Sequence, residues 1–97
     1  MLNLPDDIRA YREEILRIAA GHGARNVRVF GSVARGDAGP DSDLDLLVDA
    51  GPETTPFFPG GLVADLEQLL GRRIDIVEPE GLYWYVRDRV LREAVPL

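Results

Sequence analysis

The chain has 97 residues, a net charge of −6, no cysteine and no lysine, which excludes disulfides, thiolate or lysine nucleophiles and the lysine of a P-loop. This length suits one domain over residues 1–97, and the acidic balance argues against direct binding of nucleic acid. No apolar run reaches the roughly 18 residues of a membrane span and no signal-peptide pattern is present, which predicts a cytoplasmic protein without a membrane partner.

Residues 3–21 are predicted to form one amphipathic helix. Asn3 can cap it, and the apolar residues that share one face are Ile8, Tyr11, Ile15, Leu16, Ile18 and Ala19. A Gly-His-Gly break ends the helix. We expect His22, within this break, to be a solvated helix-end residue rather than a ligand or a base.

The next segment combines a buried strand with a polar turn. Val27–Phe30 has the short β-branched and aromatic composition of a strand. Gly31 and Ser32 then begin about one helical turn, which runs through Arg35. The serine hydroxyl and successive backbone N–H groups of such a turn would face an anion, and phosphate is the natural candidate.

Asp43–Val48 is predicted to be the second strand, because acidic and apolar residues alternate within it. Side chains two residues apart on a strand share a face, so Asp43 and Asp45 project together while the leucines between them face the core. Two adjacent carboxylates repel each other, and this arrangement indicates a site for Mg²⁺. A calcium-binding EF-hand is excluded, because a loop starting at Asp41 would have Leu46 at its sixth position and Pro52 at its twelfth.

A second helix and a third strand follow a proline-rich loop over residues 49–60. Phe57 and Phe58 in this loop either pack on the core or mark a partner surface. Leu62–Leu70 is predicted to be helical, and Arg72–Val77 to be a strand. Asp75 lies between two isoleucines, so it should occupy the face opposite the core, as the acids of the second strand do.

Leu82–Ala94 is predicted to be the last main helix. Its consecutive aromatics, Tyr83 to Tyr85, point in different directions, which favours core packing or an interface over a platform for a base. Its charged residues, Glu93 among them, are interpreted as an ordinary solvated face.

Taken together, these residues resemble the nucleotidyltransferase superfamily that includes DNA polymerase β, and in particular its minimal nucleotidyltransferases. The family pattern G-S-x-x-R-G, followed by S-D-x-D and a later strand acid, is matched at Gly31, Ser32, Arg35, Gly36, Ser42, Asp43, Asp45 and Asp75. The resemblance covers essentially the whole chain. It implies an α/β fold, with a small mixed sheet of three to four strands and helices mainly on one face.

The resemblance also implies a mechanism. Asp43, Asp45 and Asp75 would hold two Mg²⁺ ions, and Asp75 would either act as the general base for the acceptor hydroxyl or activate that hydroxyl through the metal. Gly31 and Ser32 would cradle the β and γ phosphates of ATP. Arg35 and Ser42 would add further contacts to the nucleotide.

Minimal nucleotidyltransferases of this size resemble antitoxins that are paired with HEPN-domain ribonuclease toxins. The family is similar to enzymes that transfer AMP from ATP to a tyrosine of the toxin, which silences it. Two alternatives stay open: an antitoxin that neutralises its toxin by binding alone, and a small-molecule nucleotidyltransferase of the antibiotic-modifying kind. Self-association of the chain is also left open.

Overall fold

The computed structural model describes residues 4–39 and 41–97, and its centre is one four-stranded sheet with the strand order β3-β2-β1-β4. β1 runs antiparallel to both β2 and β4, whereas β2 and β3 are parallel. The strands span Ala24–Phe30 (β1), Leu44–Ala50 (β2), Ile74–Val77 (β3) and Val95–Pro96 (β4). The predicted α/β fold with a small mixed sheet is therefore confirmed.

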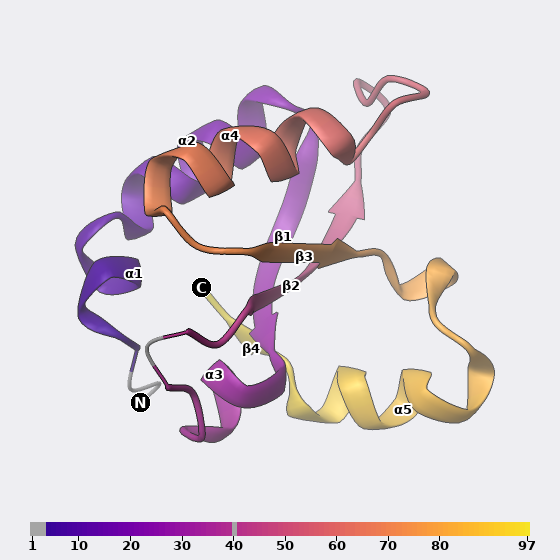
Figure 1. Ribbon diagram of the computed structural model, residues 1–97. Helices are drawn as coiled ribbons and strands as arrows, with labels where there is room; N and C mark the ends of the chain where they lie inside the picture. The colour runs from indigo at the N-terminus through magenta and orange to yellow at the C-terminus, as the bar shows by residue number, and fades with distance from the viewer. Residues whose placement is uncertain (1–3, 40) are drawn as a thin grey trace.

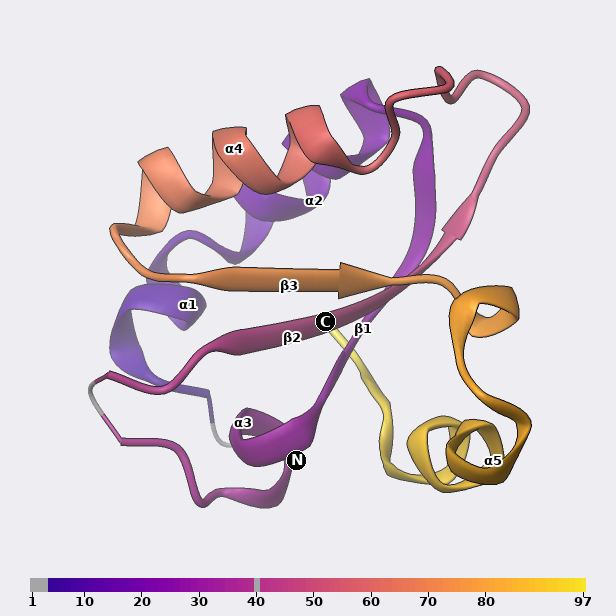
Figure 2. The ribbon, with the colours of Figure 1, turned by 45° about the vertical axis from the view of Figure 1, so that its right-hand side comes forward.

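The main helices lie on two sides of this sheet (Figure 1). α2 and α4 pack together over one face, as predicted, and α5 lies on the opposite side (Figure 2). The helices span Asp6–Ala10 (α1), Arg12–Gly21 (α2), Gly31–Arg35 (α3), Gly60–Leu70 (α4) and Trp84–Glu93 (α5), and a 3₁₀ turn, η1, spans Pro79–Gly81. Within residues 4–39 and 41–97, none of the helices has the length and apolarity needed to cross a membrane.

Alternating side chains of the strands build the core beneath α2 and α4. Every second residue of β2 and β3 is buried, and so are the inward residues of the two helices. This core includes Ile15, Ala19, Val29, Leu44, Leu46, Val48, Leu62, Leu66, Ile74 and Ile76. The intervening residues of β2 and β3, among them Asp45 and Asp75, project from the other face.

The N-terminal helix is divided, contrary to the prediction of one helix over residues 3–21. α1 ends and α2 begins at Tyr11, whose φ and ψ are −103° and 13°. The break leaves Ile8 and Ile15 fully buried while Tyr11, predicted on the apolar face, is 41% exposed. The predicted cap, Asn3, lies outside the described residues.

β1 begins at Ala24, three residues earlier than predicted, because a bulge interrupts its alternation. Asn26 has a φ of 52°, and the pairing with β2 shifts between Arg25 and Arg28. The side chain of Asn26 donates to Asp49 Oδ2 at 3.1 Å. This bond joins Asn26 to the neighbouring strand β2 and accompanies a left-handed backbone that the periodicity of the sequence could not reveal.

The segment after α5 is a short strand, for which the sequence analysis made no prediction. Val95 pairs with Val29 of β1, and the backbone N–H of Leu97 donates to the carbonyl of Val27 at 3.0 Å. Pro96 is tolerated because β4 lies at the edge of the sheet. The strand returns the chain from α5 to the middle of the molecule.

The aromatic residues of the loops and of α5 are largely exposed. Phe57 is 85% exposed, whereas its neighbour Phe58 packs against the core. Trp84 is 82% exposed, and Tyr83 and Tyr85 stack with ring centroids 5.6 Å apart. The predicted alternative of core packing is therefore wrong for Phe57 and for the aromatics at the start of α5.

Candidate active site

Asp45 and Asp75 are direct partners in the parallel pairing of β2 with β3. Each is flanked by two core residues, so both carboxylates leave the sheet on the face opposite α2 and α4. Asp45 is partly buried and Asp75 is exposed. The sheet thus brings together two of the three predicted acids and presents one of them to solvent.

The burial of Asp45 and the acidic side chains near it change its pKa. Burial, together with the nearby charges of Asp75 and Asp43, raises the pKa of Asp45 to about 6. Arg35 opposes this rise only in part. A carboxyl held near like charges in this way is stabilised in its ionised form by a bound cation.

Asp43 lies one residue before β2, not within it as predicted. Its side chain is 47% exposed, and its Oδ1 lies 4.0 Å from Nε of Arg73. Among the described residues, no three histidine, cysteine or acidic side chains come close enough to hold one metal ion in this conformation. The donor set nevertheless fits Mg²⁺, because all three predicted ligands are carboxylates and their charges act together on Asp45.

Gly31 lies directly against the carboxylate of Asp45. Its φ is 74°, and a Cβ added to it would come within 2.2 Å of Asp45 Oδ2. No other residue type could take this position without displacing the acid, since both the space and the backbone conformation require glycine. The close approach places the Gly31-Ser32 turn beside the acidic pair.

The two predicted serines lie in different surroundings. Ser32 is the second residue of α3 and is partly buried. The hydroxyl of Ser42 accepts the backbone N–H of Gly39 at 2.8 Å, which closes the loop before β2. The carbonyl of Ser42 also accepts from Arg72 at 3.3 Å, so this residue holds the loop in shape.

Glu93 is a polar residue at this site that the sequence reasoning missed. Its Oε2 accepts the backbone N–H of Gly31 at 2.8 Å, and its Oε1 accepts Nη1 of Arg35 at 2.9 Å. Burial opposes ionisation of Glu93, but these donors from Gly31 and Arg35 lower its pKa overall. The prediction of an ordinary solvated charge was wrong, because nothing local in the sequence signals a contact across 62 residues.

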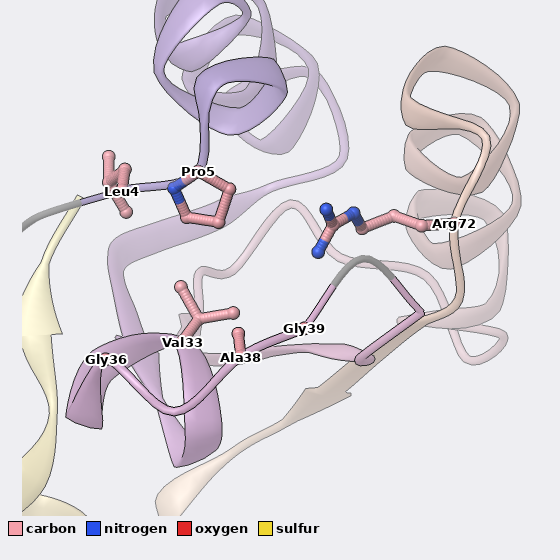
Figure 3. Close-up of a pocket in the computed structure, with 7 residues that line it drawn as sticks. All are labelled: Leu4, Pro5, Val33, Gly36, Ala38, Gly39 and Arg72. Carbon is pink, nitrogen blue, oxygen red and sulfur yellow. The ribbon is translucent and has the colours of Figure 1, made fainter.

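A cavity of about 390 Å³ lies between the N-terminal segment and the loop after α3 (Figure 3). It is lined by Leu4, Pro5, Val33, Gly36, Ala38, Gly39 and Arg72. The guanidinium of Arg72 is already bound to both carboxylate oxygens of Asp7, at 3.1 and 3.2 Å. Of the residues that match the family pattern, Gly36 lines this cavity, whereas Asp43, Asp45 and Asp75 do not.

His22 is engaged on the helical side of the molecule. Its Nε2 lies 2.7 Å from Asp65 Oδ2, which joins the end of α2 to α4. His22 lies at the end of α2, as predicted, but its side chain is bonded to Asp65 rather than free in solvent.

Comparison with known proteins gives a consistent result. The family described as "Nucleotidyltransferase domain" matches residues 8–97. The protein named "Protein adenylyltransferase MntA" from Thermococcus cleftensis is 41% identical over 93 residues, which covers 86% of this chain and 92% of that protein.

Two solved structures share the fold. One, assigned as a minimal nucleotidyltransferase, is 54% identical, has a TM-score of 0.82 and is matched over 93% of this chain and 92% of its own. Another, a toxin-antitoxin with AMP-PNP, is 19% identical, has a TM-score of 0.73 and is matched over 87% of this chain and 69% of its own. At that identity, the second likeness concerns the fold alone.

Proposed function

This chain belongs to the nucleotidyltransferase domain family, as a minimal nucleotidyltransferase enzyme, and from this premise we propose that it transfers AMP from ATP to a partner protein. The partner in this proposal is a HEPN-type ribonuclease toxin, and the acceptor is the hydroxyl of a tyrosine. The observation that carries the proposal is the pairing of Asp45 with Asp75 beside the Gly31 turn.

In this proposal, Asp43, Asp45 and Asp75 hold two Mg²⁺ ions. When bound, the metal neutralises the triphosphate and stabilises the entering and leaving oxygens of an in-line displacement. The crowded charges around Asp45 support this assignment, because they favour a cation at this point.

The remaining residues of the motif position the nucleotide. Ser32 and the Gly31 turn face the β and γ phosphates, with Arg35 and Ser42 as further contacts. Arg35 suits this role because its guanidinium presents several donors in one plane, and its side chain is 52% exposed.

At phosphorus, the reaction forms one bond and breaks one. The acceptor oxygen bonds to the α phosphorus, the bond from that phosphorus to the bridging oxygen breaks, and pyrophosphate leaves. The proton of the acceptor hydroxyl goes to the carboxylate of Asp75. Asp75 suits this role because it is exposed beside Asp45, where a protein hydroxyl can reach it.

The choice of a protein acceptor rests on the relatives. The Thermococcus cleftensis protein is named as a protein adenylyltransferase, and a structure of the same fold is a toxin-antitoxin with AMP-PNP. Both favour a protein partner and an adenine nucleotide over a small-molecule acceptor.

The proposal is tested by incubating the protein with Mg²⁺, labelled ATP and the product of a neighbouring gene that carries a HEPN-type Arg-x4-His pattern. We expect label on that partner. The double variant Asp43→Asn/Asp45→Asn should transfer at least about 100-fold less, because it removes the charges that organise the transition state. Glu13→Gln, an exposed acid on α2, serves as the control and should transfer as the parent does.

The same variants separate catalysis from simple binding. If the double variant neutralises the toxin as well as the parent at matched protein levels, occlusion rather than transfer is the mechanism. If label appears on a small molecule and never on the partner, the chain is a small-molecule nucleotidyltransferase.

A further inference from the structure

Glu93 connects the last turn of α5 to α3 through both of its carboxylate oxygens. One oxygen accepts the backbone N–H of Gly31 at 2.8 Å and the other accepts Nη1 of Arg35 at 2.9 Å. The side chain of Glu93 is only 20% exposed. A partly buried, charge-assisted contact of this kind is stronger and better defined than an ion pair in free solvent.

Arg35 is anchored at two of its three guanidinium nitrogens. Nη1 donates to Glu93, and Nε donates to Asp37 Oδ2 at 3.1 Å. Within residues 4–39 and 41–97, Nη2 has no hydrogen-bond partner, and the side chain is half exposed. Two carboxylates therefore fix the plane of the guanidinium while leaving donors for an incoming phosphate.

Gly31 is held between two carboxylates. Glu93 accepts its N–H, and Asp45 lies so close to its Cα that no Cβ fits between them. Any shift of the turn toward β2 would push Asp45 out of place, and any shift away would break the bond to Glu93. The contact with Glu93 thus fixes the spacing between the turn and the acidic pair.

We propose that Glu93 is a positioning residue for nucleotidyl transfer, which orients Arg35 toward the triphosphate and holds the Gly31 turn against Asp45. This inference rests on the proposed function. It gives α5 a role in the site although none of the predicted site residues lies on that helix.

Two substitutions separate the two contacts. Glu93→Gln keeps an oxygen that can accept from Gly31 but removes the charge opposite Arg35. We expect the KM for ATP to rise about 5- to 10-fold with kcat within about twofold of the parent. The reason is that the lost interaction stabilises the nucleotide equally in the ground state and in the transition state. Glu93→Ala frees the turn as well, so kcat should fall by about 10-fold or more.

Asp88→Asn is the matched control, because it removes the same charge from an exposed position on the same helix. Its kinetic constants should equal those of the parent. Thermal unfolding of every variant shows how much of each sample is folded. A purely structural role for Glu93 would lower the folded fraction without changing the KM for ATP.

A double-mutant cycle tests whether Glu93 acts through Arg35. Arg35→Ala should raise the KM for ATP, and adding Glu93→Gln to Arg35→Ala should raise it no further, within about twofold. Independent increases from the two substitutions would contradict the proposal.

Two other outcomes overturn it. An unchanged KM in Glu93→Gln shows that Arg35 needs no anchor, and a lower KM shows that Glu93 competes with the phosphates. If the parent transfers no AMP, the proposed function fails, and the dissociation constant of Mg²⁺-ATP measured by calorimetry then replaces the KM. The same 5- to 10-fold rise in that constant would support the positioning role, and no rise would refute it.

Discussion

At the scale of single residues, replacement of Gly31 has a direct structural consequence. A Cβ at this position would lie 2.2 Å from Asp45 Oδ2, and the φ of 74° is itself unfavourable for any side chain. We expect Gly31→Ala to lower the free energy of unfolding by about 1–3 kcal/mol and to reduce transfer at least about 100-fold. Chemical denaturation and the labelled-ATP assay measure the two effects.

Gly21→Ala is the control for this prediction. Gly21 ends α2, has no heavy atom within 4 Å of the added Cβ, and does not have a positive φ. Alanine there should leave transfer unchanged and preserve or slightly raise stability. Equal losses at both glycines would refute the steric argument at Gly31.

The raised pKa of Asp45 predicts how stability depends on pH. Its pKa is about 6 in the folded chain and 3.8 as its ordinary value, so folding favours the protonated form. Ionised Asp45 therefore destabilises the metal-free protein above pH 6, and this cost disappears as the pH falls through 6 toward 4.

Asp45→Asn removes the ionisation. At pH 8 without Mg²⁺, the free energy of unfolding of the variant should exceed that of the parent by about 1 kcal/mol, a value that is reduced because water screens the partly exposed carboxylate. This difference corresponds to a Tm that is higher by about 4–8 °C. The difference should vanish near pH 4. A parent that is equally or more stable than the variant at pH 8 would contradict the crowding of charges at this site.

At the scale of elements, the short strand β4 connects the end of α5 to the core. Leu97 is 7% exposed, its N–H bonds to Val27, and its carbonyl accepts from the side chain of Arg12. We expect Leu97→Ala to lower the free energy of unfolding by about 2 kcal/mol. Denaturant titration measures this loss.

Leu91→Ala provides the comparison for that substitution. Leu91 lies on α5 and is 42% exposed, so its truncation should cost well under 1 kcal/mol. A similar loss at both leucines would contradict the docking of the Leu97 side chain in the core.

The elements differ in how far the sequence predicts them. Alternation of acids with leucine or isoleucine is a local signal, and it correctly predicted the face on which Asp45 and Asp75 lie. β4 has two residues, which is too short for any period to emerge. The bulge at Asn26 and the break at Tyr11 depend on tertiary contacts, which override local propensity.

The candidate site could likewise be predicted where its residues are close in sequence, and not where they are far apart. The motif residues around Gly31 and Asp45 are close in sequence, and the structure brings them into contact. Glu93 was not predictable, because its partners are 58 and 62 residues away and its own neighbours in sequence are ordinary helix-surface residues.

At the scale of the molecule, nucleotide binding should stabilise the whole fold. A ligand that binds only the folded chain adds RT ln(1 + [L]/Kd), about 2.7 kcal/mol at 100 times Kd. We expect Mg²⁺ with millimolar ATP to raise Tm by several degrees, and the Asp43→Asn/Asp45→Asn variant to show little or no rise. Differential scanning fluorimetry measures both, and an unshifted parent would count against the site.

The parallel pairing of β2 with β3 also determines when a catalytic site can exist during folding. A hairpin turn joins only antiparallel strands, so Asp45 and Asp75 meet only after the chain has crossed over through α4. Closing that connection costs more loop entropy than forming the neighbouring antiparallel pair of β1 and β2, whose connecting segment is shorter. A nascent or partly unfolded chain that lacks the docked third strand therefore has no acidic pair, and enzymatic activity reports the completed fold.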